Sequence, residues 1–78
     1  MKIIFTETTV REFINDILNT SDKDIEELDY YFIINGIFYP IDEVEIYTGE
    51  IRARNTYRDE YIDVSTEEEG MIWHKEEK

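Results

Sequence analysis

The side chains in this sequence with the potential for chemistry are a single histidine and many carboxylates. The 78 residues include one His, no Cys and 20 Asp or Glu. His74 lies near the C-terminus, and the chain offers no Cys and no obvious nucleophile to accompany it, so a catalytic triad or a His-based metal site lacks its other members. Paired carboxylates occur throughout the chain, so pairing alone identifies no acid–base site of the glycosidase kind.

An EF-hand calcium loop is the closest approach to a metal motif. Asp22, Asp24 and Glu26 match the first, third and fifth ligand positions of such a loop. The sixth position requires Gly and holds Glu27, and the twelfth requires Glu and holds Ile33. The glycines are dispersed, so no Gly-rich phosphate loop is present either. The sequence therefore predicts no catalytic residue, no cofactor and no metal site, and it predicts that the protein is not an enzyme.

The unusual feature is the excess of acid. The formal net charge is −12, and no Lys or Arg occurs between Lys23 and Arg52. That interval holds eight acidic residues, namely Asp24, Glu26, Glu27, Asp29, Asp42, Glu43, Glu45 and Glu50. A field of this sign repels nucleic acid and anionic membranes and attracts basic protein surfaces. We therefore expect a basic protein partner, without direct binding to nucleic acid or membrane.

A subset of the carboxylates is predicted to make this contact. Alternate residues of a strand lie ~6.6–6.8 Å apart, which is close to the phosphate spacing along one DNA strand. Glu43 and Glu45 have this spacing, and Glu50 extends the row across a turn. The run Glu67–Glu69 forms a charged loop tip. The candidate partner-binding residues are Asp42, Glu43, Glu45, Glu50, Glu67, Glu68 and Glu69.

One α-helix is predicted near the N-terminus, from about Val10 to Asn19. Thr9 and Glu12 have the spacing of a capping box at its start. Ser21 and Asp24 have the spacing to cap a further short helical turn that ends at Leu28. The apolar residues at helical spacing, which predict one buried stripe, are Val10, Phe13, Ile14, Ile17 and Leu18.

The remainder of the chain reads as strands. Asn35-Gly36 is the preferred pair for a type I′ turn and predicts a hairpin of residues 30–34 and 37–41. Pro40 cannot donate to a ladder, so its strand lies near an edge or ends there. Alternating apolar and polar residues predict strands at 42–48, 50–54 and 60–65, and apolar segments predict further strands at 2–6 and 71–75. We expect a single α+β domain over residues 1–78, with the helix packed on a bent antiparallel sheet of about 4–6 strands.

The cellular compartment is predicted from what the sequence lacks. No signal-peptide pattern follows Met1, and no apolar stretch approaches the roughly 18 residues of a membrane span. The absence of Cys agrees with a reducing compartment. We expect a cytoplasmic protein, located in the host cell if the protein is viral.

In size and charge the chain is similar to two groups of proteins. One comprises viral DNA mimics, whose carboxylates stand in for phosphates, and the other comprises immunity or antitoxin proteins that neutralise a basic nuclease. No stretch matches a family motif, so no residue role is transferred. The leading hypothesis is a phage- or mobile-element-type inhibitor that acts as a DNA mimic on a basic surface of a host nucleic-acid-binding protein.

An accessory module that docks through aromatic side chains is the alternative from a different class. Six aromatic residues occur within 18 positions, which is more than one sheet face needs. They are Tyr30, Tyr31, Phe32, Phe38, Tyr39 and Tyr47. Exposed aromatic residues are typical of interfaces. Salt distinguishes the alternatives, because only electrostatic binding falls steeply as salt rises.

Overall fold

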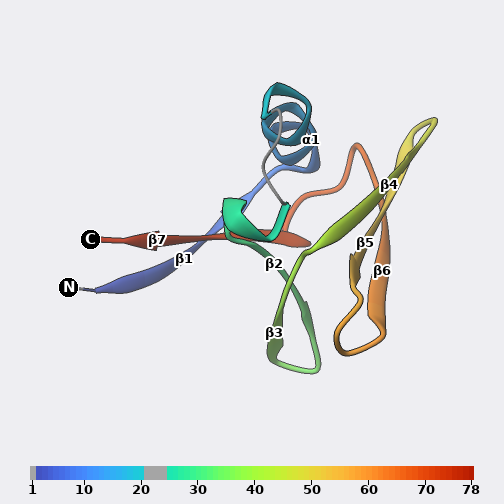
Figure 1. Ribbon diagram of the computed structural model, residues 1–78. Helices are drawn as coiled ribbons and strands as arrows, with labels where there is room; N and C mark the ends of the chain where they lie inside the picture. Colours follow the sequence, from blue (N-terminus) through green and yellow to red (C-terminus); the bar gives the residue numbers. More distant parts are fainter. Residues whose placement is uncertain (1, 21–24) are drawn as a thin grey trace.

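The computed structural model describes residues 2–20 and 25–78 (Figure 1). Within these residues it has one α-helix, one short 3₁₀ helix and seven strands in two antiparallel sheets. The elements are β1 (Ile3–Thr8), α1 (Val10–Asn19), η1 (Ile25–Leu28), β2 (Tyr30–Ile34), β3 (Ile37–Pro40), β4 (Glu43–Tyr47), β5 (Glu50–Asn55), β6 (Glu60–Ser65) and β7 (Ile72–Glu77). This combination of helix and antiparallel sheet agrees with the predicted α+β class, but the fold contains more strand than expected.

The helix forms where the sequence predicts it. Thr9 has an extended backbone, and its hydroxyl accepts a hydrogen bond from the Glu12 amide at 3.1 Å, which satisfies one free donor of the first turn. The Glu12 carboxylate accepts from the Thr8 hydroxyl at 2.9 Å. The predicted turn ending at Leu28 is η1, whereas its proposed caps, Ser21 and Asp24, lie outside the described residues.

The first sheet has four strands in the order β1-β7-β2-β3. Strands β2 and β3 form the predicted hairpin, with Ile34 opposite Ile37. Asn35 and Gly36 have φ values of 51° and 79°, as a type I′ turn requires. Strand β3 lies at the edge, as Pro40 indicated. The chain ends meet in β1 and β7, which pair along their whole length and bring the termini side by side (Figure 1).

The second sheet has three strands in the order β4-β5-β6. Its central strand buries Ile51 and Ala53 on one face and turns Arg52 and Arg54 to the other, as the alternation predicts. Val64 of β6 is buried on the same side as Ile51, its partner in the ladder.

The prediction of one bent sheet of about 4–6 strands is wrong, because the chain changes sheets after Pro40. The Ile41 amide donates to the Tyr30 carbonyl at 2.8 Å, which continues the first ladder by one bond. The next amide, that of Asp42, donates to the Arg54 carbonyl at 3.1 Å and begins the second ladder. A single chain therefore bends at this corner and supplies one strand to each sheet, as in orthogonally packed sheets.

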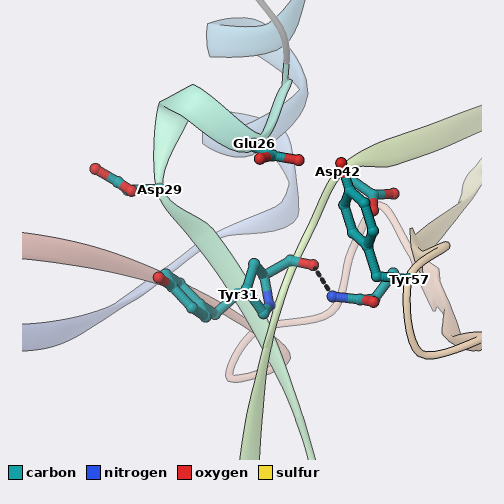
Figure 2. Close-up of a pocket in the computed structure, with 7 residues that line it drawn as sticks. Glu26, Asp29, Tyr31, Asp42 and Tyr57 are labelled. Atoms are coloured by element: carbon teal, nitrogen blue, oxygen red, sulfur yellow. Dashed lines mark hydrogen bonds between the residues drawn. The ribbon is translucent and has the colours of Figure 1, made fainter.

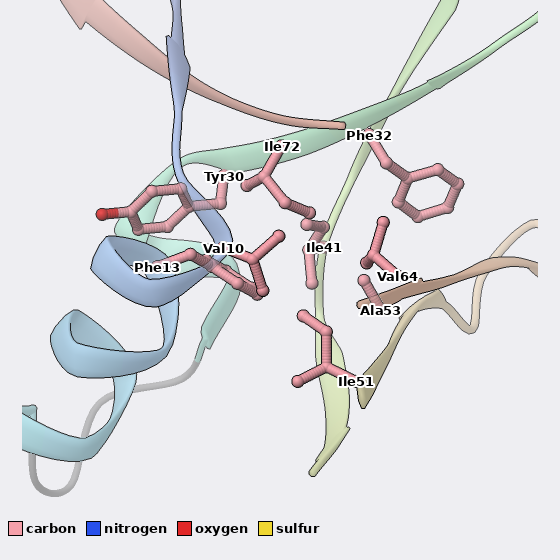
Figure 3. Close-up of a cluster of buried hydrophobic side chains, with 9 residues drawn as sticks. All are labelled: Val10, Phe13, Tyr30, Phe32, Ile41, Ile51, Ala53, Val64 and Ile72. Carbon is pink, nitrogen blue, oxygen red and sulfur yellow. The ribbon is translucent and has the colours of Figure 1, made fainter. Parts of the chain in front are cut away.

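The core lies where α1 and the two sheets meet (Figure 3). Its buried apolar residues are Val10, Phe13, Tyr30, Phe32, Ile41, Ile51, Ala53, Val64 and Ile72. Phe13 packs edge-on against the Tyr30 ring, with centroids 4.8 Å apart. The Tyr30 hydroxyl donates to Asp16 at 2.7 Å, and burial together with this carboxylate raises the pKa of the phenol far above its ordinary range.

Two apolar residues are exposed although the periodicity of their elements points them toward the core: Leu18 of the predicted helix stripe, and Ile46, which alternates with Glu43 and Glu45 along β4. Leu18, the last member of the helix stripe, is 71% exposed, because the helix buries only Val10 and Phe13 of its first turns fully. Ile46 is 48% exposed near the end of β4, next to the exposed β4–β5 turn. Both residues lie next to the last position of their element. The apolar periodicity of the sequence continues to these positions, but the elements there extend beyond the buried core.

Candidate functional site

The acidic row on β4 lies directly opposite basic residues. In the β4–β5 register Glu43 is paired with Arg54 and Glu45 with Arg52. The Arg54 guanidinium donates from Nη1 to Glu45 Oε1 at 2.7 Å. Opposite charges on neighbouring strands stabilise a sheet and reduce the field that each charge projects outward. The interval without bases in the sequence is therefore partly compensated in space by the arginines of β5.

The same arginines bind the carboxylates of β6. Arg52 donates from Nε and Nη2 to the two oxygens of Asp63, at 2.7 and 3.1 Å. Its guanidinium also lies 4.3 Å from the centre of the Tyr61 ring. This bidentate pair holds the pKa of Asp63 below its ordinary value. The outer face of the second sheet therefore carries both acidic and basic side chains, which are joined by ion pairs.

Glu45 also accepts a hydrogen bond from the Tyr47 hydroxyl. The bonds from Tyr47 and Arg54 lower the pKa of Glu45, and the Glu45 carboxylate in turn raises the pKa of the Tyr47 phenol. Glu45 is therefore ionised at neutral pH and has its hydrogen bonds within the protein.

Asp42 has a structural role at the corner between the sheets. Its carboxylate accepts from the Thr56 amide at 3.2 and 3.1 Å and from the Thr56 hydroxyl at 3.0 Å. These bonds hold the turn that follows β5. Asp42 therefore positions a loop, in addition to contributing negative charge.

The other four predicted residues lie at one end of the molecule, which we call the acidic end: Glu50, Glu67, Glu68 and Glu69. The Thr66 amide donates to the Gly49 carbonyl at 3.1 Å, so the β4–β5 turn lies beside the β6–β7 connection. Glu67 is ion-paired with Arg11 of the helix, with both side chains largely exposed. Glu50, Glu68 and Glu69 are exposed and have no basic partner among the described residues.

Few of the acids are neutralised by bases. Within residues 2–20 and 25–78, the carboxylates in ion pairs are Asp29, Glu45, Asp63, Glu67 and Glu76. The remaining carboxylates of this part of the chain have no base from the same residues within ion-pair distance. These same residues include no group of three or more possible ligands placed to hold a metal ion, and no helix there has the length and apolarity to cross a membrane.

The six aromatic residues singled out in the sequence separate into three places. Tyr30 and Phe32 are in the core, and Tyr39 stacks on Phe32 with ring centroids 5.5 Å apart. Tyr47 is on the second sheet and is 52% exposed. Tyr31 and Phe38 lie on the outer face of the first sheet, opposite the core.

Sequence reasoning missed two further aromatic residues on that outer face. Phe5 of β1 stacks on Phe38 with centroids 4.1 Å apart, and Trp73 of β7 meets Phe38 edge-on at 6.2 Å. Phe5 also contacts Tyr31 edge-on at 5.1 Å. We call Phe5, Tyr31, Phe38 and Trp73 the aromatic face. Alternation within each strand would have predicted the outward direction of these side chains, but only the β1-β7-β2-β3 order brings them together.

A hollow of about 280 Å³ adjoins this face at the corner between the sheets (Figure 2). We call it the acidic hollow, and it is lined by Glu26, Asp29, Tyr31, Pro40, Asp42, Asn55 and Tyr57. Three of these side chains are carboxylates and none is basic. The Asn55 side chain lines the hollow, and its amide donates to the Pro40 carbonyl at 2.8 Å, drawn as the dashed line in Figure 2.

His74 packs within the first sheet. Its ring lies 4.8 Å from the Tyr30 ring, and its Nδ1 is 3.6 Å from a Glu76 oxygen. These contacts give His74 a packing role in the sheet.

Comparison with known proteins gives no relative from which a function can be transferred. No protein-family model, no curated protein and no solved structure matches this chain. The functional argument therefore depends on the charges, the exposed side chains and their geometry.

Proposed function

We propose that this protein is a small acidic binding module that docks on a basic surface of another protein. The observation that carries the proposal is the surplus of carboxylates without basic partners on a chain of formal charge −12. A net charge of magnitude about 2–8 suffices to keep a small domain soluble. Self-repulsion beyond that range destabilises a compact state, so its persistence throughout the fold favours a use in binding.

The narrower form of this proposal is a phage- or mobile-element-type inhibitor that mimics nucleic acid, with an immunity or antitoxin protein as a related form. Size, charge and the phosphate-like spacing of strand carboxylates support it. Because Glu45 is ion-paired with Arg54 and Glu67 with Arg11, the mimicry would depend chiefly on the exposed acids outside these pairs. Among the predicted partner-binding residues these are Glu43 on β4 and Glu50, Glu68 and Glu69 of the acidic end.

Docking through aromatic side chains is the second candidate, and the aromatic face favours it. Four rings gather on the side of the first sheet opposite the core, and Phe38 is 36% exposed. Aromatic residues are enriched in interfaces because they bury a large area with few rotatable bonds.

Affinity capture tests the proposal. The immobilised protein is incubated with a lysate of its source cells and washed at about 50 or 500 mM salt, and retained proteins are identified by mass spectrometry. We expect a retained protein with a basic surface that is released by high salt. Duplex DNA added as a competitor should release the same protein if the module mimics nucleic acid.

Two outcomes would count against the electrostatic proposal. Retention of one specific partner at both salt concentrations would favour aromatic docking. A specific partner without a basic surface would contradict the proposed function itself.

A further inference from the structure

The rings of the aromatic face meet across the full width of the first sheet. Phe5 and Phe38 come from the two edge strands of a four-stranded sheet, which would separate them by roughly 14 Å if the sheet were flat. Their ring centroids are instead 4.1 Å apart. The two side chains therefore lean toward each other over the strands between them, and the contacts of Phe38 with Phe5, Tyr31 and Trp73 make one continuous apolar surface.

The acidic hollow continues this surface on one side. Tyr31 and Pro40, which are partners in the β2–β3 ladder, line the hollow, and Tyr31 also belongs to the aromatic face. The volume of about 280 Å³ is at the low end for a ligand pocket, which suits one long side chain better than a cofactor. Its carboxylates, from Glu26, Asp29 and Asp42, favour a cationic occupant.

The protein itself contains one cation held at this boundary. Lys75 Nζ lies 3.9 Å from an Asp29 oxygen and 6.0 Å from the centre of the Tyr31 ring. A carboxylate and an aromatic face together stabilise an ammonium or guanidinium group. Lys75 neutralises part of the charge of Asp29, whereas no base among the described residues is ion-paired with Glu26 or Asp42.

We propose that the aromatic face and the acidic hollow together bind a basic polypeptide segment of the partner. An apolar side chain of the segment packs on the rings, and a neighbouring Lys or Arg side chain enters the hollow. An apolar centre beside a charged rim has the anatomy of a protein interface. This inference rests on the proposed function and specifies the contact.

Charge complementarity selects this occupant over a second copy of the chain. Two copies would bring net charges of −12 against each other, which opposes self-association through a face with an acidic rim. Addition of a strand at the β3 edge is also disfavoured, because Pro40 has no amide to donate to it. The segment therefore lies on the face of the sheet.

A random peptide library panned against the immobilised protein tests this inference. We expect enrichment of peptides that combine Lys or Arg with an apolar or aromatic residue. Phe38→Ala and Glu26→Gln should each weaken binding of the enriched peptides by about tenfold or more, as at interface hot spots. Tyr47→Ala is the matched control, since it removes an exposed aromatic residue from an edge strand of the other sheet.

Each result separates the inference from the proposed function. Basic peptides that bind wild type, Phe38→Ala and Glu26→Gln equally would overturn this site and leave a basic partner in place. Enrichment of acidic or uncharged peptides would overturn the proposed function as well. A library without enrichment would overturn the site as a binder of peptide segments. Glu26 is exposed on η1, so Glu26→Gln remains informative even if Phe38→Ala unfolds the sheet.

Discussion

Asn55→Ala should destabilise the fold at the corner where the two sheets meet. Asn55 is 3% exposed and is the one buried polar residue among those described. Its Nδ2 donates to the Pro40 carbonyl at 2.8 Å, and its Oδ1 accepts from the Arg58 amide at 2.8 Å. The side chain therefore ties the end of β5 both to the sheet-switching segment and to the following turn.

The expected loss follows from these two bonds. Each contributes a net of about 0.5–1.5 kcal/mol, and a buried group left without a partner adds a desolvation penalty. The turn at Arg58 is exposed, so water can replace one bond, which gives a loss of about 2–3 kcal/mol in the free energy of unfolding. For a domain of this size the melting temperature should fall by roughly 10–20 °C.

Urea unfolding followed by circular dichroism and by Trp73 fluorescence measures this loss. The midpoint should fall while the denaturant slope is unchanged, because the same surface is exposed on unfolding. Asn19→Ala is the matched control, since the Asn19 amide makes an exposed bond to Asn15 at 3.2 Å, and it should cost less than about 0.5 kcal/mol. If Asn55→Ala also stays within about 0.5 kcal/mol of wild type, the role assigned to the corner is refuted.

Three further predictions concern the core, an ion pair and the histidine. Phe13→Ala should cost roughly 3–5 kcal/mol, enough to unfold most of the protein, and a cooperative melt near that of wild type would contradict its place in the core. Arg52→Gln should reduce the free energy of unfolding most above about pH 5 and least in acid, because the ion pair with Arg52 depresses the pKa of Asp63 in the folded state and its stabilising effect is lost as pH falls through that pKa. Urea titrations from pH 2 to 7, about one pH unit apart, should show the stabilities of variant and wild type converging as pH falls. His74→Ala should lower stability slightly by removing the contact with Tyr30, yet leave partner binding intact; a loss of binding without unfolding would assign His74 a direct role.

Local signals predicted the elements of this fold well. The helix from Val10 to Asn19 follows from one capping residue and an apolar stripe, and the hairpin follows from the two positive φ values that Asn35-Gly36 accepts readily. Both signals act within a few residues. The change of sheets after Pro40 depends on amide bonds to Tyr30 and Arg54, which are distant in the sequence, so periodicity alone could not reveal it.

The pairing of the β4 acids was within reach of the sequence. A two-residue turn at Thr48-Gly49 sets Tyr47 opposite Glu50, and counting outward then pairs Glu45 with Arg52. The interval without bases ends where these arginines begin, so linear charge counting overstated the field of that row. The register of a hairpin decides which charges neutralise each other.

The aromatic face could not be predicted from patterns within single segments of the sequence, because it depends on how distant strands pair. Phe5 and Trp73 lie near opposite ends of the chain, and only the pairing of β1 with β7 brings them beside Tyr31 and Phe38. A density of aromatic residues between 30 and 47 suggested an interface, but strand alternation assigns Tyr30 and Phe32 to the core. The outward rings could therefore be identified only after the topology was known.

The association rate with the captured partner, measured against salt, tests most directly the claim that unpaired carboxylates drive binding. The comparison is wild type against a variant with Glu43, Glu50, Glu68 and Glu69 all changed to Gln, four exposed acids outside the ion pairs. At about 50 mM salt the variant should associate roughly tenfold more slowly, and its rate should change less between 50 and about 500 mM. Its free energy of unfolding should hold or rise slightly, because self-repulsion falls. Equal rates for the two proteins, unchanged by salt, would contradict the account.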